Sequence, residues 1–459
     1  MPSNPTRRDA LKLGAAGLGL GAAAAFLPDA VAARPHRPFE APSLGPAPAQ
    51  LPTAPPMDVV RIGFVGVGLQ GGSHVRNFLG IEGVEVTALC DIDVPRMEEV
   101  AGWVEADGRP RPALYGQRGN LDFQRMCDDL ELDLVFTATP WTWHVPVCLY
   151  AMQTGSHAAT EVPAAYTTDG CWALVEAAER HEKHCVMMEN CNYDRPEMMV
   201  FHMARLGMFG EILHAECGYL HDLRAIKFED RNEGLWRRDH SRMRNGNLYP
   251  THGLGPVCNV MDVNRGDRLD HLVSMSCPSR GLQAYAQEHF PPGSPKRRER
   301  FVLGDVNTAL IKTARGRTIY VSHDTNLPRP YSRIHMVQGT KGIFQGYPHR
   351  VHLEGRSPDH RWEPAEDYYP EFEHPLWTDL RDASEGAGHG GMDFLEDYRL
   401  IACLRAGVPT DMNVYDAAVL SVVGPLTEWS VANGSNRVDI PDFTRGRWRE
   451  WPQLDVVRG

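Results

Sequence analysis

Apolar residues in the first part of the chain fall into short runs, separated by stretches with helical periodicity. The runs that predict strands are residues 59–65, 84–89, 132–137, 158–160 and 185–188. The stretches that predict helices are residues 73–79, 94–104, 146–153 and 168–181. Strands that alternate with helices at this spacing predict βαβ units, right-handed crossovers and a parallel sheet. We expect this α/β domain to end near residue 190.

The hydrophobic pattern changes after residue 190. Alternation typical of strands occurs at residues 212–219, 272–276, 307–313, 318–324 and 334–339. Few helices are expected before two long ones at residues 393–405 and 413–433. This order predicts an α+β domain whose open-faced sheet is mixed or antiparallel and carries helices on one face. We therefore assign residues 57–190 to the first domain, and residues 191–459 to a second domain for substrate binding and oligomerisation.

The N-terminus differs from both domains. Arg7 and Arg8 precede a short, weakly hydrophobic stretch at residues 13–27, and small residues follow at 30–33. A charged start, a short apolar region and an A-x-A site are typical of an export signal, and the paired arginines indicate the twin-arginine route. The alternative is a cytosolic protein with a frayed basic N-terminus.

The export signal predicts where the protein works. We expect a signal peptide over residues 1–33, a disordered Pro/Ala-rich linker over residues 34–56, and a periplasmic or secreted protein. The apolar stretch is too short and too rich in Gly and Ala for stable membrane insertion. An exported enzyme finds no free dinucleotide pool outside the cell, so a cofactor of that kind should be held tightly and regenerated in each turnover.

Composition narrows the classes of function. A chain of 459 residues is too long for one ordinary core, which favours two domains. The net charge is −12, and the basic cluster at residues 296–300 reads as a solvated loop, so we expect no nucleic-acid partner. The ten cysteines have no C-x-x-C pairs or zinc-type spacing. We interpret them as small buried hydrophobes and expect no metal site.

A glycine-rich loop follows the first predicted strand. It contains Gly66, Gly68 and Gly71, and Asp91 lies about 20 positions further on, at the end of the next strand. The first glycine permits a tight turn, the second lets the backbone approach a pyrophosphate, and the third allows close helix–strand contact. Asp91 would accept hydrogen bonds from ribose hydroxyls and repel a 2′-phosphate. This predicts a Rossmann domain that binds NAD rather than NADP; the alternative is a glycine turn with a surface aspartate.

Polar groups also follow the later strands of the first domain. Trp141-Thr142-Trp143-His144 comes after one strand, Glu161-Val162-Pro163 after the next, and Glu189-Asn190 after the last. Ligands of doubly wound sheets lie at the carboxyl ends of the strands. Indole and imidazole groups need hydrogen-bond partners, so the tryptophan–histidine segment is poorly explained as core. The three segments together predict a cofactor crevice.

These motifs make the chain resemble the Gfo/Idh/MocA oxidoreductases and, more narrowly, glycoside hydrolase family 109, the NAD-dependent α-N-acetylgalactosaminidases. The resemblance covers most of the chain after the predicted signal. In the second domain it rests on the segments Tyr219-Leu220-His221-Asp222-Leu223-Arg224, Asn245-Gly246-Asn247-Leu248-Tyr249-Pro250-Thr251-His252-Gly253, Arg329-Pro330-Tyr331-Ser332 and Gly388-His389-Gly390-Gly391-Met392-Asp393.

The resemblance implies roles for individual residues. It implies NAD contacts from Leu69, Gln70, Asp91, Trp141, His144, Glu161, Val162 and Asn190. It implies substrate contacts from Tyr219, Arg237, Tyr249, His252 and Tyr331. His389 resembles the catalytic histidine of the family, on a mobile glycine-flanked segment. The chain departs from related proteins twice, with Val162 where dehydrogenases of the superfamily have lysine, and Gln70 where we expect arginine in many glycosidase relatives.

The reaction implied by the resemblance uses the cofactor without consuming it. C3 of the sugar is oxidised, the C2 proton becomes acidic, the glycosidic oxygen leaves C1, water adds, and C3 is reduced again. Histidine suits the proton transfers because it titrates near neutral pH, so His389 and His252 are the candidate catalytic residues. Each candidate also has a non-catalytic alternative. His389 could be a surface histidine in a flexible loop, His252 a structural histidine and Arg237 a surface ion-pair partner. The three tyrosines could be core residues with a hydrogen-bonded hydroxyl.

Three functions therefore compete. The first is an exported glycosidase acting on terminal α-N-acetylgalactosamine or a related hexose. The second is a periplasmic sugar oxidoreductase with tightly bound NAD, and the third is a non-catalytic dinucleotide- or sugar-binding protein. The sequence leaves open the exact sugar and anomer, the natural glycan, the base that removes the C2 proton, and whether the chain forms a homodimer through its second-domain sheet.

Overall fold

The computed structural model describes residue 39 and residues 41–455, so the predicted signal peptide lies outside the described residues. Within those residues, none of the helices is both long and apolar enough to cross a membrane. The prediction that residues 34–56 form a disordered linker is wrong for its second half. Ala47 and Ala54 are buried, and Arg445 Nε donates to the carbonyl of Gly45 at 2.8 Å. This segment packs against the C-terminal part of the second domain, where a Cβ on Gly407 would also lie 2.7 Å from the carbonyl oxygen of Ala54.

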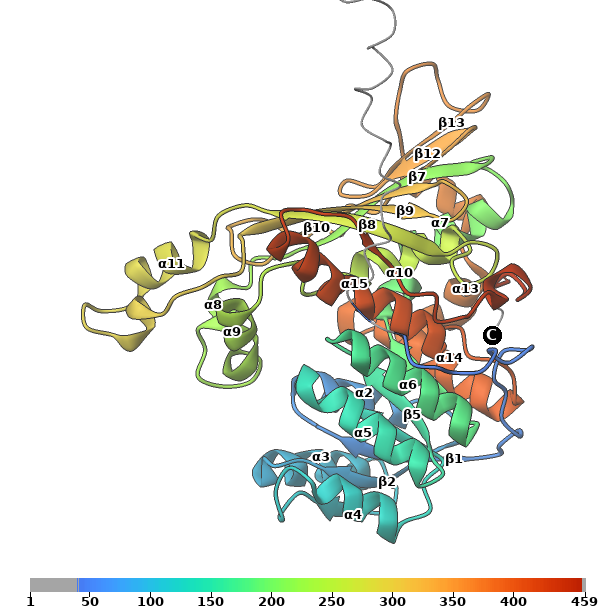
Figure 1. Cartoon of the computed structure of the whole chain (residues 1–459). Helices are drawn as coiled ribbons and strands as arrows, with labels where there is room; N and C mark the ends of the chain where they lie inside the picture. Colours follow the sequence, from blue (N-terminus) through green and yellow to red (C-terminus); the bar gives the residue numbers. More distant parts are fainter. Residues whose placement is uncertain (1–38, 40, 456–459) are drawn as a thin grey trace, which may run out of the picture. The chain divides into compact units, whose positions relative to one another are not determined.

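The first sheet has six parallel strands in the order β3-β2-β1-β4-β5-β6 (Figure 1). The strands are β1 (Val60–Val65), β2 (Val84–Cys90), β3 (Ala113–Tyr115), β4 (Leu134–Thr137), β5 (His157–Glu161) and β6 (Cys185–Met188). The helices of this domain are α2 (Leu69–Leu79), α3 (Val94–Ala106), α4 (Asp122–Asp129), α5 (Trp141–Gln153) and α6 (Thr168–His181). This arrangement confirms the predicted Rossmann-like domain.

The hydrophobic pattern did not predict two elements of this domain, β3 and α4. β3 has only three residues, and α4 is mostly polar, with Phe123, Met126 and Cys127 as its buried apolar side chains. α2 begins at Leu69, four residues before the predicted start, because the residues of the glycine loop form its first turn. Elements this short or polar carry too few apolar positions for a periodic signal.

The second sheet has nine strands in the order β14-β13-β12-β11-β7-β10-β9-β8-β15. The strands are β7 (Ile212–Leu220), β8 (Leu269–Ser276), β9 (Val306–Thr313), β10 (Thr318–Asp324), β11 (Met336–Gly339), β12 (Gly342–Gln345), β13 (Arg350–Leu353), β14 (Glu363–Pro364) and β15 (Val438–Asp439). β7 and β10 pair in parallel, and the other pairs are antiparallel. The sheet is therefore mixed, which confirms the predicted class.

The expectation of few helices before residue 393 is wrong. The helices after β6 are α7 (Arg195–Arg205), α8 (Arg224–Lys227), α9 (Gly234–Met243), α10 (Thr251–Val260), α11 (Gly281–His289), α12 (Tyr369–Phe372), α13 (Pro375–Ser384), α14 (Met392–Ala406) and α15 (Val414–Ala432). α10 contains Gly253, Gly255 and Pro256, which are weak helix formers. Gly253 is required there, since a Cβ would lie 2.4 Å from the nitrogen of Gly218 in β7. The close approach of α10 to the sheet overrides its weak helix propensity.

Helices of the second domain cover the first one. Asp397 of α14 bonds to two residues of α2, and Tyr415 of α15 donates to Glu179 of α6 at 2.7 Å. Both long helices lie beside the parallel sheet in Figure 1. One continuous apolar cluster consequently runs through both domains, and α14 brings its side chains to the carboxyl edge of the sheet.

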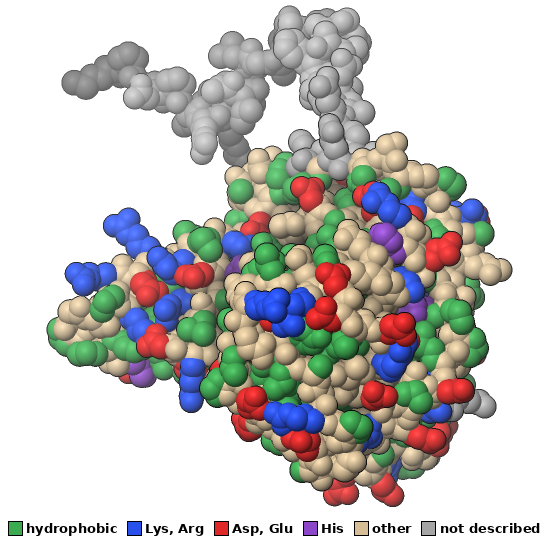
Figure 2. Space-filling model, turned by 90° about the horizontal axis from the view of Figure 1, so that it is seen from below, with side chains coloured by type: hydrophobic (Ala, Val, Ile, Leu, Met, Phe, Trp, Pro, Cys, Tyr) green, Lys and Arg blue, Asp and Glu red, His purple; other side chains and the backbone are tan. Residues whose placement is uncertain are grey.

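α8, α9 and α11 form a projection with the 3₁₀ helix η3 (Pro295–Arg298) (Figure 1). The projection has a small apolar cluster of its own around Phe228 and Leu282. Figure 2 shows Lys and Arg side chains along it. The basic cluster at residues 296–300 lies here, and η3 replaces part of the solvated loop expected from its sequence.

Candidate functional site

The glycine loop has the geometry expected of a pyrophosphate cradle. Gly66 has φ +84°, which favours glycine. A Cβ on Gly71 would lie 2.0 Å from the carbonyl oxygen of Gly66, so only glycine fits at this contact. A Cβ on Gly68 would meet nothing within 4 Å, and Leu69 beside it is exposed. The loop thus leaves backbone open at the start of α2, where a helix N-terminus attracts phosphate.

Asp91 and Arg96 support this loop. Asp91 lies at the end of β2, and its Oδ2 accepts from the Val67 nitrogen at 2.7 Å. Arg96 donates through Nε to the carbonyl of Val67 and through Nη2 to that of Gly68, both at 2.9 Å. Sequence reasoning missed Arg96, although its place near the start of the helix after Asp91 was a usable signal. The carboxylate of Asp91 binds a backbone N–H of the loop and the guanidinium of Arg96 binds two of its carbonyls, so both stabilise the loop conformation.

Trp141 and His144 begin the helix after β4. Trp141 is buried and stacks against Tyr249, with ring centroids 5.6 Å apart. His144 is also buried, and its Nδ1 and Nε2 each lie 2.8 Å from a backbone carbonyl, those of Pro163 and Thr139. Each ring nitrogen of His144 therefore faces a backbone carbonyl, one of them that of Pro163 next to the buried Val162. A contact between His144 and NAD stays a prediction.

Glu161 belongs to a buried ionic network that the sequence did not reveal. His74 of α2 places Nε2 2.7 Å from Glu161 and Nδ1 2.8 Å from Asp397 of α14. Asn77 donates to the same Asp397 at 2.9 Å. Burial disfavours the charged imidazole, but the two carboxylates raise the pKa of His74 well above its ordinary value. Through these two contacts His74 ties the cofactor edge of the sheet to the second domain.

Asp393, at the start of α14, contacts three predicted site residues. It accepts from Asn190 at 2.7 Å and from Gln70 at 3.3 Å, and His389 Nδ1 lies 2.8 Å away. Burial opposes its ionisation, but His389 and its other partners lower the pKa of Asp393 to about 2. The hydrogen bond with Asp393 raises the pKa of His389. Asp393 was missed as a site residue, and it links the glycine loop to the histidine.

His389 lies in the His389 loop, the 3₁₀ turn Gly388–Gly391. Its φ is +50° and its side chain is 54% exposed. A Cβ on Gly388 would lie 3.1 Å from Ser73 Oγ of α2, so the loop packs directly against the helix after the glycine loop. An exposed imidazole held by one buried carboxylate can transfer a proton to a ligand beside the loop.

The predicted substrate residues cluster around Tyr219, and we call this cluster the aromatic group. The ring of Tyr219 lies 4.7 Å from that of Tyr249 and 5.3 Å from that of His252. Arg237 of α9 lies 5.0 Å from the Tyr249 ring and forms an ion pair with Glu233 at 2.8 Å. The structure brings these residues together from β7, α9 and α10. Aromatic faces with few charges are typical of sugar pockets.

Tyr331 completes this group. Its ring lies 6.1 Å from that of Tyr219, and its hydroxyl accepts from Arg333 at 3.1 Å. Arg333 is buried and paired with Glu197 at 2.8 Å. His221, also missed by sequence reasoning, lies 3.0 Å through Nδ1 from the Tyr219 hydroxyl. The hydroxyls of Tyr219 and Tyr331 are thus oriented by neighbouring side chains, as a binding pocket requires.

Glu189, Cys191 and His252 are the one group among the described residues that could supply three ligand atoms to a metal, with those atoms within 4.8 Å of one another. His252 Nδ1 lies 2.6 Å from Glu189 Oε1, so the pair already uses two of these atoms. Burial raises the pKa of the Cys191 thiol well above its ordinary value, which disfavours the thiolate that binds metals. The arrangement fits a hydrogen-bonded carboxylate–histidine pair better than a metal centre.

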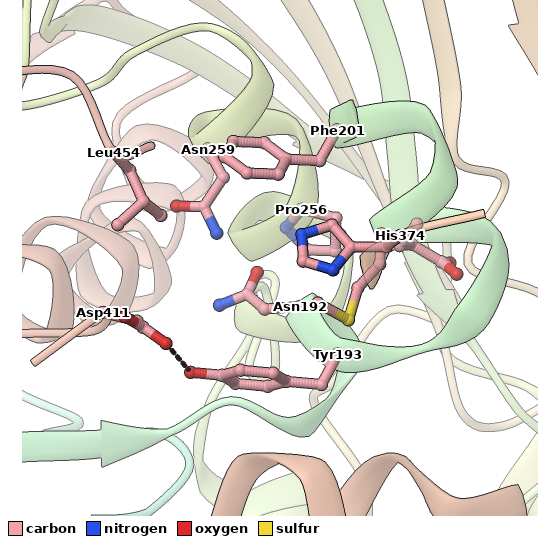
Figure 3. A pocket seen from close by; sticks show the side chains of 10 residues that line it. Asn192, Tyr193, Phe201, Pro256, Asn259, His374, Asp411 and Leu454 are labelled. Carbon is pink, nitrogen blue, oxygen red and sulfur yellow. Dashed lines mark hydrogen bonds between the residues drawn. The ribbon is translucent and has the colours of Figure 1, made fainter. Parts of the chain in front are cut away.

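A separate hollow lies on the other side of the turn after β6 (Figure 3). Asn192, Tyr193, Asn259 and His374 point into it. The Tyr193 hydroxyl donates to Asp411 at 3.1 Å. Tyr193 is close in sequence to Asn190 but contributes to this hollow, which none of the predicted cofactor or substrate residues line. The candidate site is the region where the glycine loop, the His389 loop and the aromatic group meet, connected by the Asp393–Asn190, Glu189–His252 and Trp141–Tyr249 contacts.

Comparison with known families and proteins matches this architecture. Residues 60–189 match the family model "Oxidoreductase family, NAD-binding Rossmann fold", and residues 193–450 match "Glycosyl hydrolase 109, C-terminal domain". A Glycosyl hydrolase family 109 protein of Shewanella pealeana is 46% identical over 421 residues, covering 91% of this chain and 92% of that protein. The chain belongs to glycosyl hydrolase family 109. This confirms the resemblance inferred from the motifs.

Solved structures of oxidoreductases share the fold of this family 109 protein. An oxidoreductase domain protein from Kribbella flavida has a TM-score of 0.65 at 16% identity, over 84% of this chain and all of that chain (100%). An inositol dehydrogenase homolog from Azotobacter vinelandii, complexed with NAD⁺, has a TM-score of 0.62 at 19% identity, over 85% of this chain and 99% of that chain. These structures show the shared fold, and the two family models and the family 109 relative show that the chain is an enzyme with an NAD-type dinucleotide-binding domain.

Proposed function

We propose that this family 109 enzyme is an exported glycosidase that removes terminal α-N-acetylgalactosamine, or a related hexose, using a retained NAD. The observation that carries the proposal is the placement of two carboxylate-bound histidines, His389 and His252, at one crevice beside the open glycine loop. Val162 stands where dehydrogenases of the superfamily have a lysine, and it is buried. The site therefore has no lysine at the position used by simple alcohol dehydrogenases.

NAD fits the residues present better than NADP. Asp91 sits at the end of β2 with its carboxylate partly exposed, where a 2′-phosphate would meet negative charge. The nearby Arg96 donates to two loop carbonyls and to Glu99 at 2.8 Å, so its charge is already paired. When bound, NAD supplies reversible hydride acceptance at C3 of the sugar.

The histidines divide the proton transfers. His389 stays protonated to higher pH because of Asp393, and it is placed to give a proton to the departing glycosidic oxygen. His252 faces the aromatic group and is placed to receive a proton from the sugar. Tyr219, Tyr249 and Arg237 hold the ring by stacking and hydrogen bonding. Each histidine regains its starting protonation state when water adds to C1.

The N-terminal motif supports a periplasmic or secreted location. Arg7 and Arg8, the apolar stretch and the small residues at 30–33 favour the twin-arginine route. That route carries folded proteins, so the cofactor would be bound before export. A reaction that restores its cofactor in each cycle needs no dinucleotide outside the cell.

We further propose that the chain forms a homodimer through its open sheet. Met275 of β8 and Leu310 of β9 are large hydrophobic residues that are 61% and 55% exposed. The register pairs Met275 with Thr308 and Val273 with Leu310, so both side chains lie on one face. Exposed apolar positions that gather on one sheet face are typical of subunit contacts.

A single assay separates the proposed glycosidase from an oxidoreductase and from a binding protein. Purified full-length enzyme is incubated with 4-nitrophenyl α-N-acetylgalactosaminide without added cofactor, and 4-nitrophenol and NADH are followed together. Release of 4-nitrophenol without net NADH supports the proposal. Stoichiometric NADH without cleavage would indicate a sugar oxidoreductase, and neither signal, with the 4-nitrophenyl derivatives of the related hexoses also tested, would indicate a binding protein.

A further inference from the structure

The carboxylate of Glu189 is buried and contacts the ring of His252. Glu189 directly follows β6 and precedes the 3₁₀ turn η2 (Asn190–Tyr193). It is 1% exposed, and its Oε1 accepts from the Cys191 nitrogen at 3.3 Å and lies 2.6 Å from His252 Nδ1. A backbone N–H therefore helps to position the same carboxylate oxygen that contacts His252.

The helix that carries His252 is pressed onto Glu189. A Cβ on Gly255 of α10 would lie 2.8 Å from Glu189 Cγ, and a Cβ on Gly253 would lie 2.4 Å from the nitrogen of Gly218. Side chains at these two positions would push α10 away from both neighbours. The two glycines thus allow the close approach that keeps the short Glu189–His252 contact in place.

This contact decides which nitrogen of His252 carries the proton. An ionised carboxylate only accepts hydrogen bonds, so Nδ1 must be the donor, and the neutral ring then has its lone pair on Nε2. No other described residue bonds to Nε2. The ring lies 5.3 Å from that of Tyr219 and 4.8 Å from that of Tyr249. Nε2 is therefore an open proton acceptor among the residues that line the sugar site.

His389 differs in its surroundings. Its partner Asp393 is shared with Asn190 and Gln70, and its own side chain is 54% exposed on a glycine-flanked turn. His252 is only 13% exposed and is fixed on a helix. A fixed acceptor suits removal of a carbon-bound proton, which needs close alignment, whereas an exposed donor suits a departing oxygen.

We infer that Glu189 is the positioning residue that makes His252 the base for the C2 proton. This rests on the proposed glycosidase function. With C3 at the ketone level, His252 Nε2 takes the C2 proton, and the C2–H electron pair forms an enolate. That pair then becomes the C1–C2 double bond as the C1–O bond breaks, and the departing oxygen takes a proton from His389. The charges balance, because one histidine gains the proton that the other loses.

The test compares the full-length enzyme with E189Q, E189D and a control, E179Q. Glu179 is a partly buried carboxylate that also accepts a hydrogen bond, from Tyr415 at 2.7 Å, and it lies on α6 rather than beside His252. The first readout is the His252 tautomer, measured by ¹⁵N NMR of histidine-labelled protein and assigned with a His252→Gln variant. We expect the Nδ1–H form in the wild type and in E179Q. In E189Q the amide can donate to Nδ1, so we expect the Nε2–H form.

The second readout is kinetic. We expect E189Q to lower kcat about 100-fold or more with little change in KM, and to slow C2 deuterium exchange from solvent equally. E189D should restore part of the rate, because it restores the acceptor, whereas E179Q should match the wild type. A wild-type Nε2–H tautomer, or full kcat and exchange in E189Q, would overturn the inference.

Two further outcomes stay distinguishable. If the wild type cleaves no glycoside, the proposed function fails, but the tautomer still decides whether Glu189 orients His252. If the enzyme binds Zn²⁺ or Mn²⁺ stoichiometrically and E189Q abolishes that binding, the group is a metal site and the inference is wrong. We expect no such binding, and no loss of activity with EDTA.

Discussion

Asp393 offers the sharpest test of how the two domains build one site. Its carboxylate is 1% exposed and meets His389, Asn190 and Gln70. Replacing it with asparagine keeps the size and one acceptor oxygen but removes the charge. Both the charge state of His389 and the anchoring of its loop should change in consequence.

The structure sets the size of the effect on stability. A pKa of about 2 against an ordinary 3.8 corresponds to about 2.5 kcal/mol in favour of the charged carboxylate. A lowered carboxyl pKa stabilises the fold above the ordinary pKa, and this contribution is lost as the pH falls from 3.8 towards 2. We expect D393N to lose up to about 2.5 kcal/mol at neutral pH, with the difference from wild type closing in that acidic window.

The effect on catalysis has a direction that the same variant tests. The pKa of His389 is raised by Asp393, so D393N should lower it. The alkaline limb of the kcat profile should then move to lower pH, since His389 is required in its protonated form. Urea denaturation at several pH values and initial rates of 4-nitrophenol release give the two measurements.

The control for the pH profile is D133N. Asp133 is bonded to Arg61 at 2.9 Å and also has a lowered pKa, because its bonds with Arg61 outweigh burial, but it lies just before β4 at the opposite edge of the sheet. D133N should lose stability without moving the alkaline limb. An unchanged alkaline limb in D393N, or an equal movement in D133N, would refute the assigned role of Asp393.

Three other variants probe separate parts of the account. G71A should lose retained NAD, because its Cβ would lie 2.0 Å from the Gly66 carbonyl oxygen; the measurement is NAD released per chain on denaturation, and undiminished NAD would contradict the cradle. R333M should lower the free energy of unfolding by about 3–5 kcal/mol in urea denaturation, because it leaves the buried Glu197 carboxylate without its ion-pair partner and removes the donor to the Tyr331 hydroxyl. A near-neutral change would argue against that network. L310E should give monomers by light scattering if the open sheet is the dimer face, and an unaltered dimer would exclude that face.

The sequence predicted the features that depend on local pattern. The parallel sheet followed from apolar runs such as 185–188, and the last long helix was expected at residues 413–433, where the structure begins it with a capping box between Asn413 and Asp416. The glycine loop was recognisable from its spacing, and the structure gives Gly66 and Gly71 separate steric reasons, a positive φ and a contact without room for a Cβ. These signals need no knowledge of distant contacts.

The buried partners of the site were not predictable in the same way. His74 and Asp397 are 323 positions apart, and Glu189 and His252 are 63 positions apart. Hydrophobic periodicity does not indicate which polar side chains meet across such separations. The position of His144 between two backbone carbonyls was likewise not indicated by the sequence, which placed this histidine only at the sheet edge.

The central claim is that the enzyme cleaves its glycoside by oxidation and elimination with a cofactor that it never gives up. The most direct measurement is hydrolysis of 4-nitrophenyl α-N-acetylgalactosaminide in D₂O without added NAD, with mass and NMR analysis of the released sugar. The account predicts deuterium at C2 of the product and no net NADH. A product that carries only protium at C2 after complete turnover would contradict it.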